Sequence, residues 1–135
     1  MKWRKNQAGM SLVEVAVAVM VISIVLTGIL GLYYQSVLVT KKMNQLFIAT
    51  NLAKSRLERL RNIAYDSLPL TSETDTLLDK EGNTIVNGDF VRNTAVSTSY
   101  NGDADLTQVT VTVDYKMKGA FTGSPVTLTT VFVNE

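Results

Sequence analysis

Residues 15–34 form an uninterrupted apolar run, VAVAVMVISIVLTGILGLYY, without one charged side chain. A helix of about twenty such residues, at roughly 1.5 Å per residue, spans a bilayer core of about 30 Å. A cleavable secretory signal has a shorter apolar region that is followed by a small-residue site. Here the small residues Ala8 and Gly9 come before the run instead. The pattern therefore predicts a transmembrane helix rather than an ordinary signal peptide.

Apolar residues then recur at spacings of three and four, which predicts an amphipathic continuation of the same helix. We expect one stripe to pack on a sheet; it consists of Val39, Met43, Leu46, Thr50, Ala53, Leu57, Leu60 and Ala64. A second patch, Ile48, Leu52 and Ile63, lies elsewhere around the helix and is a candidate subunit contact, unless loops of the head cover it. Because no proline precedes Pro69, we expect one helix from about residue 11 to 64, with Pro69 as its stop.

The remaining residues read as a small antiparallel sheet. Residues 90–100 and 126–133 are rich in β-forming residues, and residues 109–116 alternate valine or tyrosine with polar residues, as in a half-buried strand. Residues 73–83 read as a loop with a turn at 81–83, Asn101-Gly102 as a turn, and 119–125 as a loop. The fold class is α+β: a long N-terminal helix, half transmembrane and half amphipathic, packed on an antiparallel head.

Charge is distributed unevenly along the chain, although the net charge is only +1. Lys2, Arg4 and Lys5 precede the apolar run, so the positive-inside rule keeps the N-terminus in the cytoplasm and the head outside. Basic residues also dominate residues 32–62, while acidic residues dominate from residue 63 onward. Arg56, Arg59 and Arg61 read most simply as a solvated helix face. The near-balanced total gives no reason to expect nucleic-acid binding.

Composition also limits the chemistry. The chain contains neither cysteine nor histidine, so it lacks the commonest general base and metal ligand. Asn101, Asp103 and Asp105 alternate like the start of a calcium loop, but Thr112 stands where an EF-hand places its glutamate. We therefore expect no enzyme activity, no metal and no cofactor.

One acidic residue, Glu14, stands at the edge of the apolar run. A lone carboxylate near the membrane is costly unless it reaches the interface or meets a cation. If the chain is cut between Gly9 and Met10, Met10 acquires an ammonium group that can pair with Glu14, within one chain or between neighbouring chains.

Small residues also mark the apolar run. Ser23, Thr27 and Gly31 recur every four residues, with Gly28 beside them. Small residues let helix backbones approach closely, whereas glycine alone also weakens a helix by about 1 kcal/mol relative to alanine. The run therefore predicts a helix-packing surface, a locally weakened helix, or both.

Residues 5–15, KNQAGMSLVEV, resemble the class III signal of type IV prepilins. That resemblance implies a leader of residues 1–9, cleavage after Gly9 by a prepilin peptidase, N-methylation of Met10 and an assembly charge pair of Glu14 with Met10. Met10 departs from the phenylalanine that is more usual there. The resemblance continues through 28–32 and 51–61, which are similar to minor pilins of the PilV type and to minor pseudopilin I of type II secretion.

The resemblance implies a structural minor subunit of a type IV pilus that primes assembly or lies at the tip. The implied regions are a leader (1–9), an assembly helix (10–34), an outer helix (35–66) and a head (67–135). The implied partners are other pilins, the prepilin peptidase, a platform protein, a separate ATPase and the membrane. A minor pseudopilin of a secretion or DNA-uptake system is one alternative. A single-pass membrane binding protein that never polymerises is another.

Overall fold

The computed structural model describes residues 11–134. Its elements are α1 (Leu12–Arg61), a 3₁₀ segment (Tyr65–Thr71), β1 (Glu73–Leu78), β2 (Phe90–Thr98), a short 3₁₀ turn (Tyr100–Gly102), β3 (Leu106–Met117), β4 (Ala120–Phe121) and β5 (Val126–Val133). The chain divides into two compact units, and the division falls within α1 between Thr40 and Lys41. The predicted α+β class, a long N-terminal helix with an antiparallel sheet, is confirmed.

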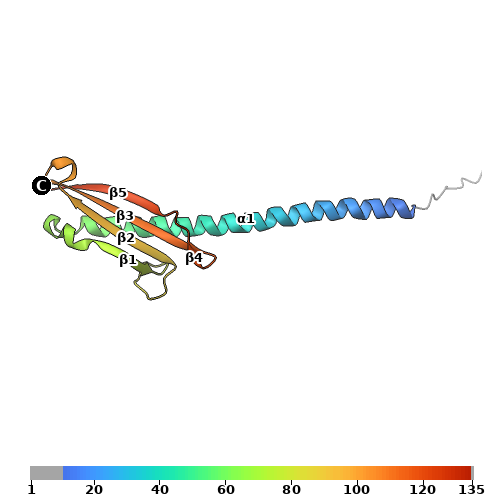
Figure 1. Ribbon diagram of the computed structural model, residues 1–135, viewed down its shortest axis with the longest axis horizontal. Helices are drawn as coiled ribbons and strands as arrows, with labels where there is room; N and C mark the ends of the chain where they lie inside the picture. Colours follow the sequence, from blue (N-terminus) through green and yellow to red (C-terminus); the bar gives the residue numbers. More distant parts are fainter. Residues whose placement is uncertain (1–10, 135) are drawn as a thin grey trace, which may run out of the picture. The chain divides into compact units, whose positions relative to one another are not determined.

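The sheet of the second unit is antiparallel throughout and is ordered β1-β2-β3-β5, as Figure 1 shows. β3 is the central strand: β2 pairs with it from Phe90↔Tyr115 to Thr98↔Thr107, and β5 pairs with its other side. The short β4 continues that second side by pairing with the last residues of β3. Each of β1, β2 and β3 thus pairs with the strand that follows it in the sequence, as short connections favour, whereas β5 pairs with β3 and not with β4.

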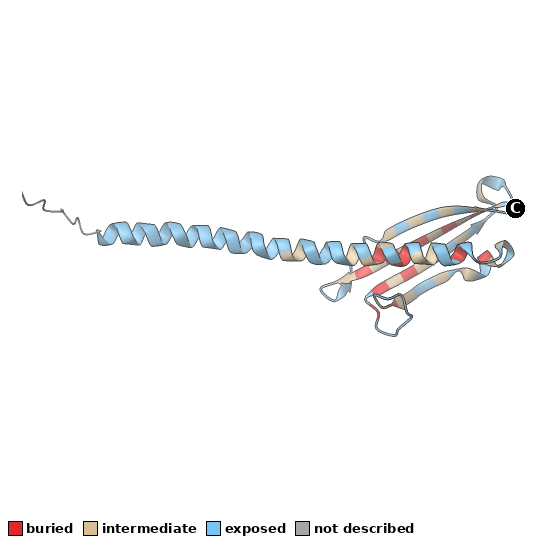
Figure 2. Ribbon diagram, turned by 180° about the vertical axis from the view of Figure 1, so that it is seen from behind, coloured by how far each residue is buried: buried red, intermediate tan, exposed pale blue. Residues whose placement is uncertain are grey.

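The core lies between one face of this sheet and the second half of α1. Along β3 the burial alternates without interruption, so that Thr107, Val109, Val111, Val113 and Tyr115 are buried. This confirms the predicted alternation. The helix contributes Ala49, Leu52, Ala53 and Leu60 to the same core. Figure 2 shows the buried residues gathered where this part of α1 crosses the sheet.

The predicted stripe on α1 is confirmed only in part. Ala53 and Leu60 are fully buried, and Leu46, Thr50 and Leu57 are half-buried. Val39, Met43 and Ala64 are exposed. The face of the helix that packs on the sheet instead runs through Ala49, Ala53 and Leu60, and small alanines there let the helix lie close to the strands.

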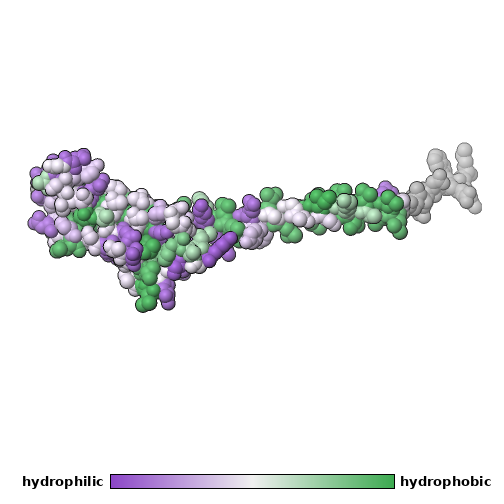
Figure 3. All heavy atoms as spheres, in the orientation of Figure 1, coloured by the Kyte–Doolittle hydropathy of each residue, from purple (hydrophilic) through white to green (hydrophobic). Residues whose placement is uncertain are grey.

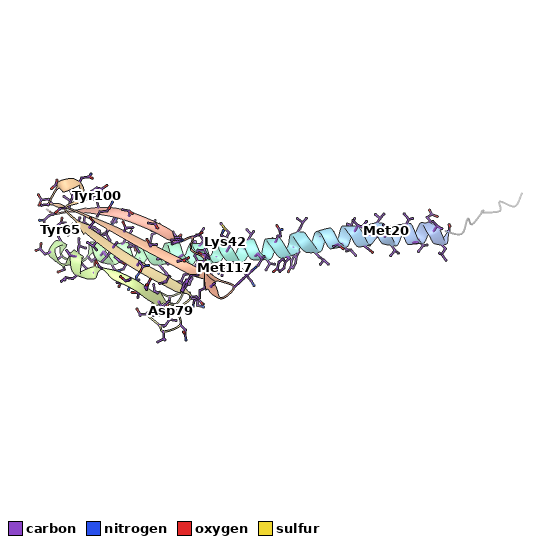
Figure 4. All side chains as sticks on the ribbon, in the orientation of Figure 1. Met20, Lys42, Tyr65, Asp79, Tyr100 and Met117 are labelled. Carbon is purple, nitrogen blue, oxygen red and sulfur yellow. The ribbon has the colours of Figure 1, made fainter. Side chains whose placement is uncertain are left out.

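Pro69 does not end the helix, contrary to prediction. The last turn tightens at Leu60, whose carbonyl accepts the Ile63 N–H at 3.2 Å, and Ala64 is extended with φ −57° and ψ 139°. Pro69 lies inside the 3₁₀ segment that follows. Within the same segment Leu68 is buried in the core. The Tyr65 hydroxyl also accepts a hydrogen bond from Thr107 at 2.9 Å, and Figure 4 shows Tyr65 at the same end of the sheet as Tyr100.

Residues 73–83, predicted as a loop, begin with strand β1. Its pairing with β2 shifts between Glu73 and Thr76, forming a bulge in which Asp75 has a φ of 49°. The turn predicted at 81–83 is present, and its Asp79 carboxylate accepts the backbone N–H groups of Glu81 and Asn83. A polar strand with a bulge lacks the alternation by which a strand is recognised in a sequence.

The predicted loop 119–125 contains β4 and is held against the sheet by Asp114. This carboxylate accepts hydrogen bonds from the Thr122 hydroxyl at 2.6 Å and from the Gly123 N–H at 3.0 Å. Burial raises the pKa of Asp114, but these bonds and one from the Tyr115 N–H outweigh it, so the pKa lies below its ordinary value. The charged form of Asp114 therefore stabilises this hairpin.

Candidate assembly site

The first turn of α1 carries Glu14. The Ser11 carbonyl accepts the N–H groups of Glu14 at 2.9 Å and of Val15 at 3.2 Å, which closes that turn. A carboxylate in this position interacts favourably with the positive end of the helix dipole. Gly9 and Met10 lie outside the described residues, so the cleavage site, the methylated residue and the Met10–Glu14 pair remain predictions.

The Glu14 carboxylate is available to a partner. Glu14 is exposed, and within residues 11–134 no basic side chain lies at ion-pair distance from it. A charge at the start of an apolar helix, without a counter-charge in the described part of its own chain, is able to pair with a cation supplied by another chain or by a new N-terminus.

The helix that follows exposes its apolar side chains on all sides. Every residue from Leu12 to Ser36 is exposed, and Leu12 reaches 86%. The apolar surface is visible as the green stretch of α1 in Figure 3. By length and composition, α1 is able to cross a membrane. An apolar surface of this extent needs lipid or other protein chains to cover it.

The small residues of this helix have their polar groups satisfied locally. The Ser23 hydroxyl donates to the Val19 carbonyl and the Thr27 hydroxyl to the Ser23 carbonyl, each at 2.8 Å. A Cβ added at Gly28 or Gly31 would meet no atom within 4 Å. Contacts among the described residues therefore do not require glycine at either position, and the helix-packing role of these residues remains a prediction.

The second apolar patch is not the free surface that was expected. Leu52 is only 7% exposed and belongs to the core, while Ile48 and Ile63 are half-buried against it. The turn after β1 covers Leu52: a Cβ on Gly82 would lie 3.1 Å from the Leu52 Cδ2 atom. For Leu52 this favours the alternative interpretation, that loops of the head cover the patch, while a role of Ile48 and Ile63 in a subunit contact remains a prediction.

The sequence analysis did not predict a charged cluster in the second unit, formed by Arg56, Glu73 and Arg92. Arg56 was expected on a solvated face, but its Nη2 lies 2.9 Å from Glu73 Oε1, and Arg92 donates to the same carboxylate from Nε at 2.8 Å. Arg56 Nη2 also donates to the Thr71 carbonyl at 2.9 Å. The available signal was helical spacing, because residue 56 follows Ala49 and Ala53 and precedes Leu60 on the buried face.

The loop that resembles the start of a calcium site forms a simple polar turn. The Asp103 side chain accepts the Asp105 N–H at 3.0 Å. Among residues 11–134, no group of three or more acidic side chains is arranged to hold a metal ion.

Comparison with known proteins identifies the N-terminal segment. Residues 4–30 match the model of the prokaryotic N-terminal methylation motif, a segment that includes Gly9, Met10 and Glu14. Neither the curated proteins nor the solved structures contain a match to the chain. The motif supports a type IV pilin-like prepilin, a class of protein that is generally structural rather than enzymatic.

The same match carries consequences for location and processing. Together with the apolar helix it indicates membrane anchoring. It also implies processing by a prepilin peptidase and assembly with other pilins into filaments.

Proposed function

We propose that this chain is a minor structural subunit of a type IV pilus. It waits in the cytoplasmic membrane with its N-terminus inside and its head outside, loses a leader of residues 1–9, and is N-methylated on Met10. Its apolar helix then leaves the lipid for the filament core. The observation that carries the proposal is the match of residues 4–30 to the N-terminal methylation motif.

The solvent exposure of the side chains suggests a separate role for each region of the mature chain. We assign residues 10–34 to the assembly helix, 35–66 to the outer helix and 67–135 to the sheet head. Residues 11–34 of the first region are all exposed, so no described residue covers this apolar surface, whereas from Ala49 onward α1 contributes to the core of the head. The N-terminal helix is therefore the part that has most to gain from contact with other chains.

The charge pair explains how a helix with an acidic first turn enters an apolar filament core. Cleavage after Gly9 creates an ammonium group on Met10, and Glu14 supplies the opposite charge. Burying either charge alone would cost several kcal/mol, roughly, whereas burying both together offsets much of that cost. A neighbour's amine is the partner we favour, because it makes neutralisation depend on assembly.

Close approach of helices is the second element of assembly. Ser23, Thr27 and Gly31 form a stripe without bulky side chains, and Gly28 and Gly31 have open space around them. Such stripes allow backbone-to-backbone packing in lipid or in a filament core. Glycines in place of a mid-helix proline, together with the resemblance to PilV-type pilins, lead us to assign a minor role, in priming the fibre or at its tip.

The remaining machinery is separate from this chain. A prepilin peptidase cuts and methylates it, a platform protein receives it, and an ATPase drives extraction. The sequence contains no phosphate-binding loop of the G-x-x-x-x-G-K-[ST] type that would let the chain act as its own motor.

The proposal predicts that Glu14→Ala remains in the membrane but enters filaments at least about tenfold less often, because a buried amine then lacks its counter-charge. The measurement is the ratio of this subunit in sheared fibres to that in membranes, by quantitative mass spectrometry. Glu58→Ala is the matched control, since Glu58 is an exposed glutamate on the same helix. Equal incorporation of both variants and the wild type would contradict the role assigned to Glu14.

A further inference from the structure

A small hollow of about 170 Å³ lies between α1, the turn after β1 and strand β2. α1 contributes Asn51, Ser55 and Arg59, the turn contributes Lys80 and Gly82, and β2 contributes Arg92. The turn is the one that carries Asp79 in Figure 4. All of these residues belong to the second unit. We propose that this hollow binds a small oxyanion, a phosphate or carboxylate group.

Charge is the first argument. Arg59, Lys80 and Arg92 line the hollow, and Glu81 is the only acidic residue among its lining residues. Glu81 lies 3.7 Å from Lys80 in an exposed pair. Glu73 does not line the hollow, but its carboxylate pairs with both Arg56 and Arg92 and neutralises only one of their two positive charges. The hollow therefore carries a positive surplus that an anion would reduce.

Preorganisation is the second argument. Arg92 is only 8% exposed and is held by Glu73 through two bonds, Nε to Oε2 at 2.8 Å and Nη2 to Oε1 at 3.2 Å. Its remaining nitrogen, Nη1, has no partner among the described residues. Guanidinium groups fixed in this way bind carboxylate and phosphate with little loss of entropy. The Arg92 guanidinium is thus already held in place before any ligand binds.

The neutral polar groups and the size of the hollow agree with this chemistry. The Ser55 hydroxyl and the Asn51 amide make no side-chain hydrogen bond elsewhere in residues 11–134, so both are free to donate. At about 30 Å³ per water molecule, a hollow of about 170 Å³ holds roughly five to six waters. A phosphate ion has a similar number of heavy atoms, whereas a larger ligand would need the turn to move.

The pKa of Arg56 also reflects the positive charges near the hollow. Burial lowers the pKa of its guanidinium, Glu73 opposes that shift, and Arg92 and Arg59 add to it. A bound anion beside Arg92 would relieve this repulsion and stabilise the head. The inference does not depend on cleavage or on filament assembly.

The test uses the full chain in an uncharged detergent. Sodium phosphate replaces sodium chloride at constant ionic strength, and the thermal unfolding midpoint and the Gly82 amide resonance are followed. We expect a saturable shift in both. A parallel titration with acetate distinguishes the two kinds of ligand. If both phosphate and acetate give saturable shifts, the site accepts either a carboxylate or a phosphate group. If only phosphate does, the site is specific for phosphate.

Two variants make the site specific. Arg59→Gln should weaken phosphate binding roughly tenfold, the effect of one charged hydrogen bond, and Lys80→Gln should weaken it in the same direction. Arg61→Gln, the same substitution two residues along the helix, should leave it unchanged. Absence of a saturable shift with either anion would overturn the proposal. Equal effects of Arg59→Gln and Arg61→Gln would also overturn it, as an adventitious ion only.

Discussion

Glu73 shows how one side chain determines the position of several others. Among residues 11–134 it is the only carboxylate at ion-pair distance from Arg56 of α1 and Arg92 of β2, and the Thr94 hydroxyl donates to it as well. Through this residue the helix, the first strand and the second strand are connected by charged hydrogen bonds. Such bonds are about twice as strong as neutral ones when both partners are shielded from water.

Replacing Glu73 by Gln should therefore lower the free energy of unfolding by about 1–3 kcal/mol, because the buried guanidinium of Arg92 and the half-buried guanidinium of Arg56 lose their shared counter-charge. The estimate is below that for a fully buried pair, since Glu73 retains 24% exposure. Chemical denaturation of the full chain in detergent measures it. Glu81→Gln, which removes an exposed pair, is the control and should change stability by less than about 0.5 kcal/mol.

Gly88 is a second residue whose identity the structure explains. A Cβ at this position would lie 2.5 Å from both the nitrogen and the oxygen of Leu78, which are backbone atoms at the end of β1. Neither atom is able to move without breaking the pairing of that strand. The position therefore requires glycine because of space rather than because of an unusual backbone angle.

Gly88→Ala should cost about 2–3 kcal/mol or more of unfolding free energy through this overlap. Gly102→Ala is the comparison: its site is open, but its φ of +84° strains an alanine, so a smaller cost of about 1–2 kcal/mol is expected. The same denaturation measurement applies to both. A Gly88 variant as stable as the wild type would show that β1 does not approach residue 88 as closely as described.

At the scale of elements, α1 serves two environments with one continuous backbone. Its first part exposes valine, isoleucine and leucine on every side, while its second part buries a face of alanine and leucine residues against a sheet. The first kind of surface suits lipid and other helices, and the second suits a single folded head. We therefore expect the change in pattern near residue 35 to separate these two environments.

Periodic signals in the sequence predicted the helix and the central strand β3, and a composition rich in β-forming residues predicted β2 and β5. Weak signals explain the errors. Strand β1 is polar and bulged at Asp75, and the end of α1 depends on where Leu68 and Tyr65 find partners on the sheet. Likewise, the burial of Leu52 depends on a turn thirty residues away in the chain, roughly, which no local pattern in the helix records.

The same contrast applies to the functional residues: one group was predicted from the sequence and another was not. The signal at residues 5–15 was recognised by its resemblance to the class III signal of type IV prepilins, which is a short linear segment, and it lies within the residues 4–30 that match the methylation motif. The Arg56–Glu73–Arg92 cluster was not recognised, because it joins a helix to two strands and exists only after folding.

For the helix, we predict that Gly31→Leu leaves the head folded but lowers incorporation into filaments several-fold, roughly, because a large side chain holds neighbouring helices apart. Ala18→Leu is the control, since residue 18 lies on roughly the opposite side of the helix at about 100° per residue. The ratio of subunit in sheared fibres to that in membranes is the measurement. Equal incorporation of the two variants would remove the stripe from the assembly surface.

At the scale of the whole molecule, two functions are assigned to separate parts of the chain. The N-terminal segment contains the processing motif and an apolar helix. The second unit has its own core and its own charged cluster. Because the core does not involve the apolar run, the head is able to remain folded while the helix exchanges lipid for other helices.

Processing is where the account is tested most directly. The measurement is the mass and fragmentation of the N-terminal peptide from protein recovered from cells that contain the prepilin peptidase. We predict a chain that starts at N-methylated Met10, with residues 1–9 absent, and a Gly9→Val variant that keeps them. A recovered chain that still begins Met1-Lys2-Trp3, in cells that process other prepilins, would contradict the account and favour a single-pass membrane protein that does not polymerise.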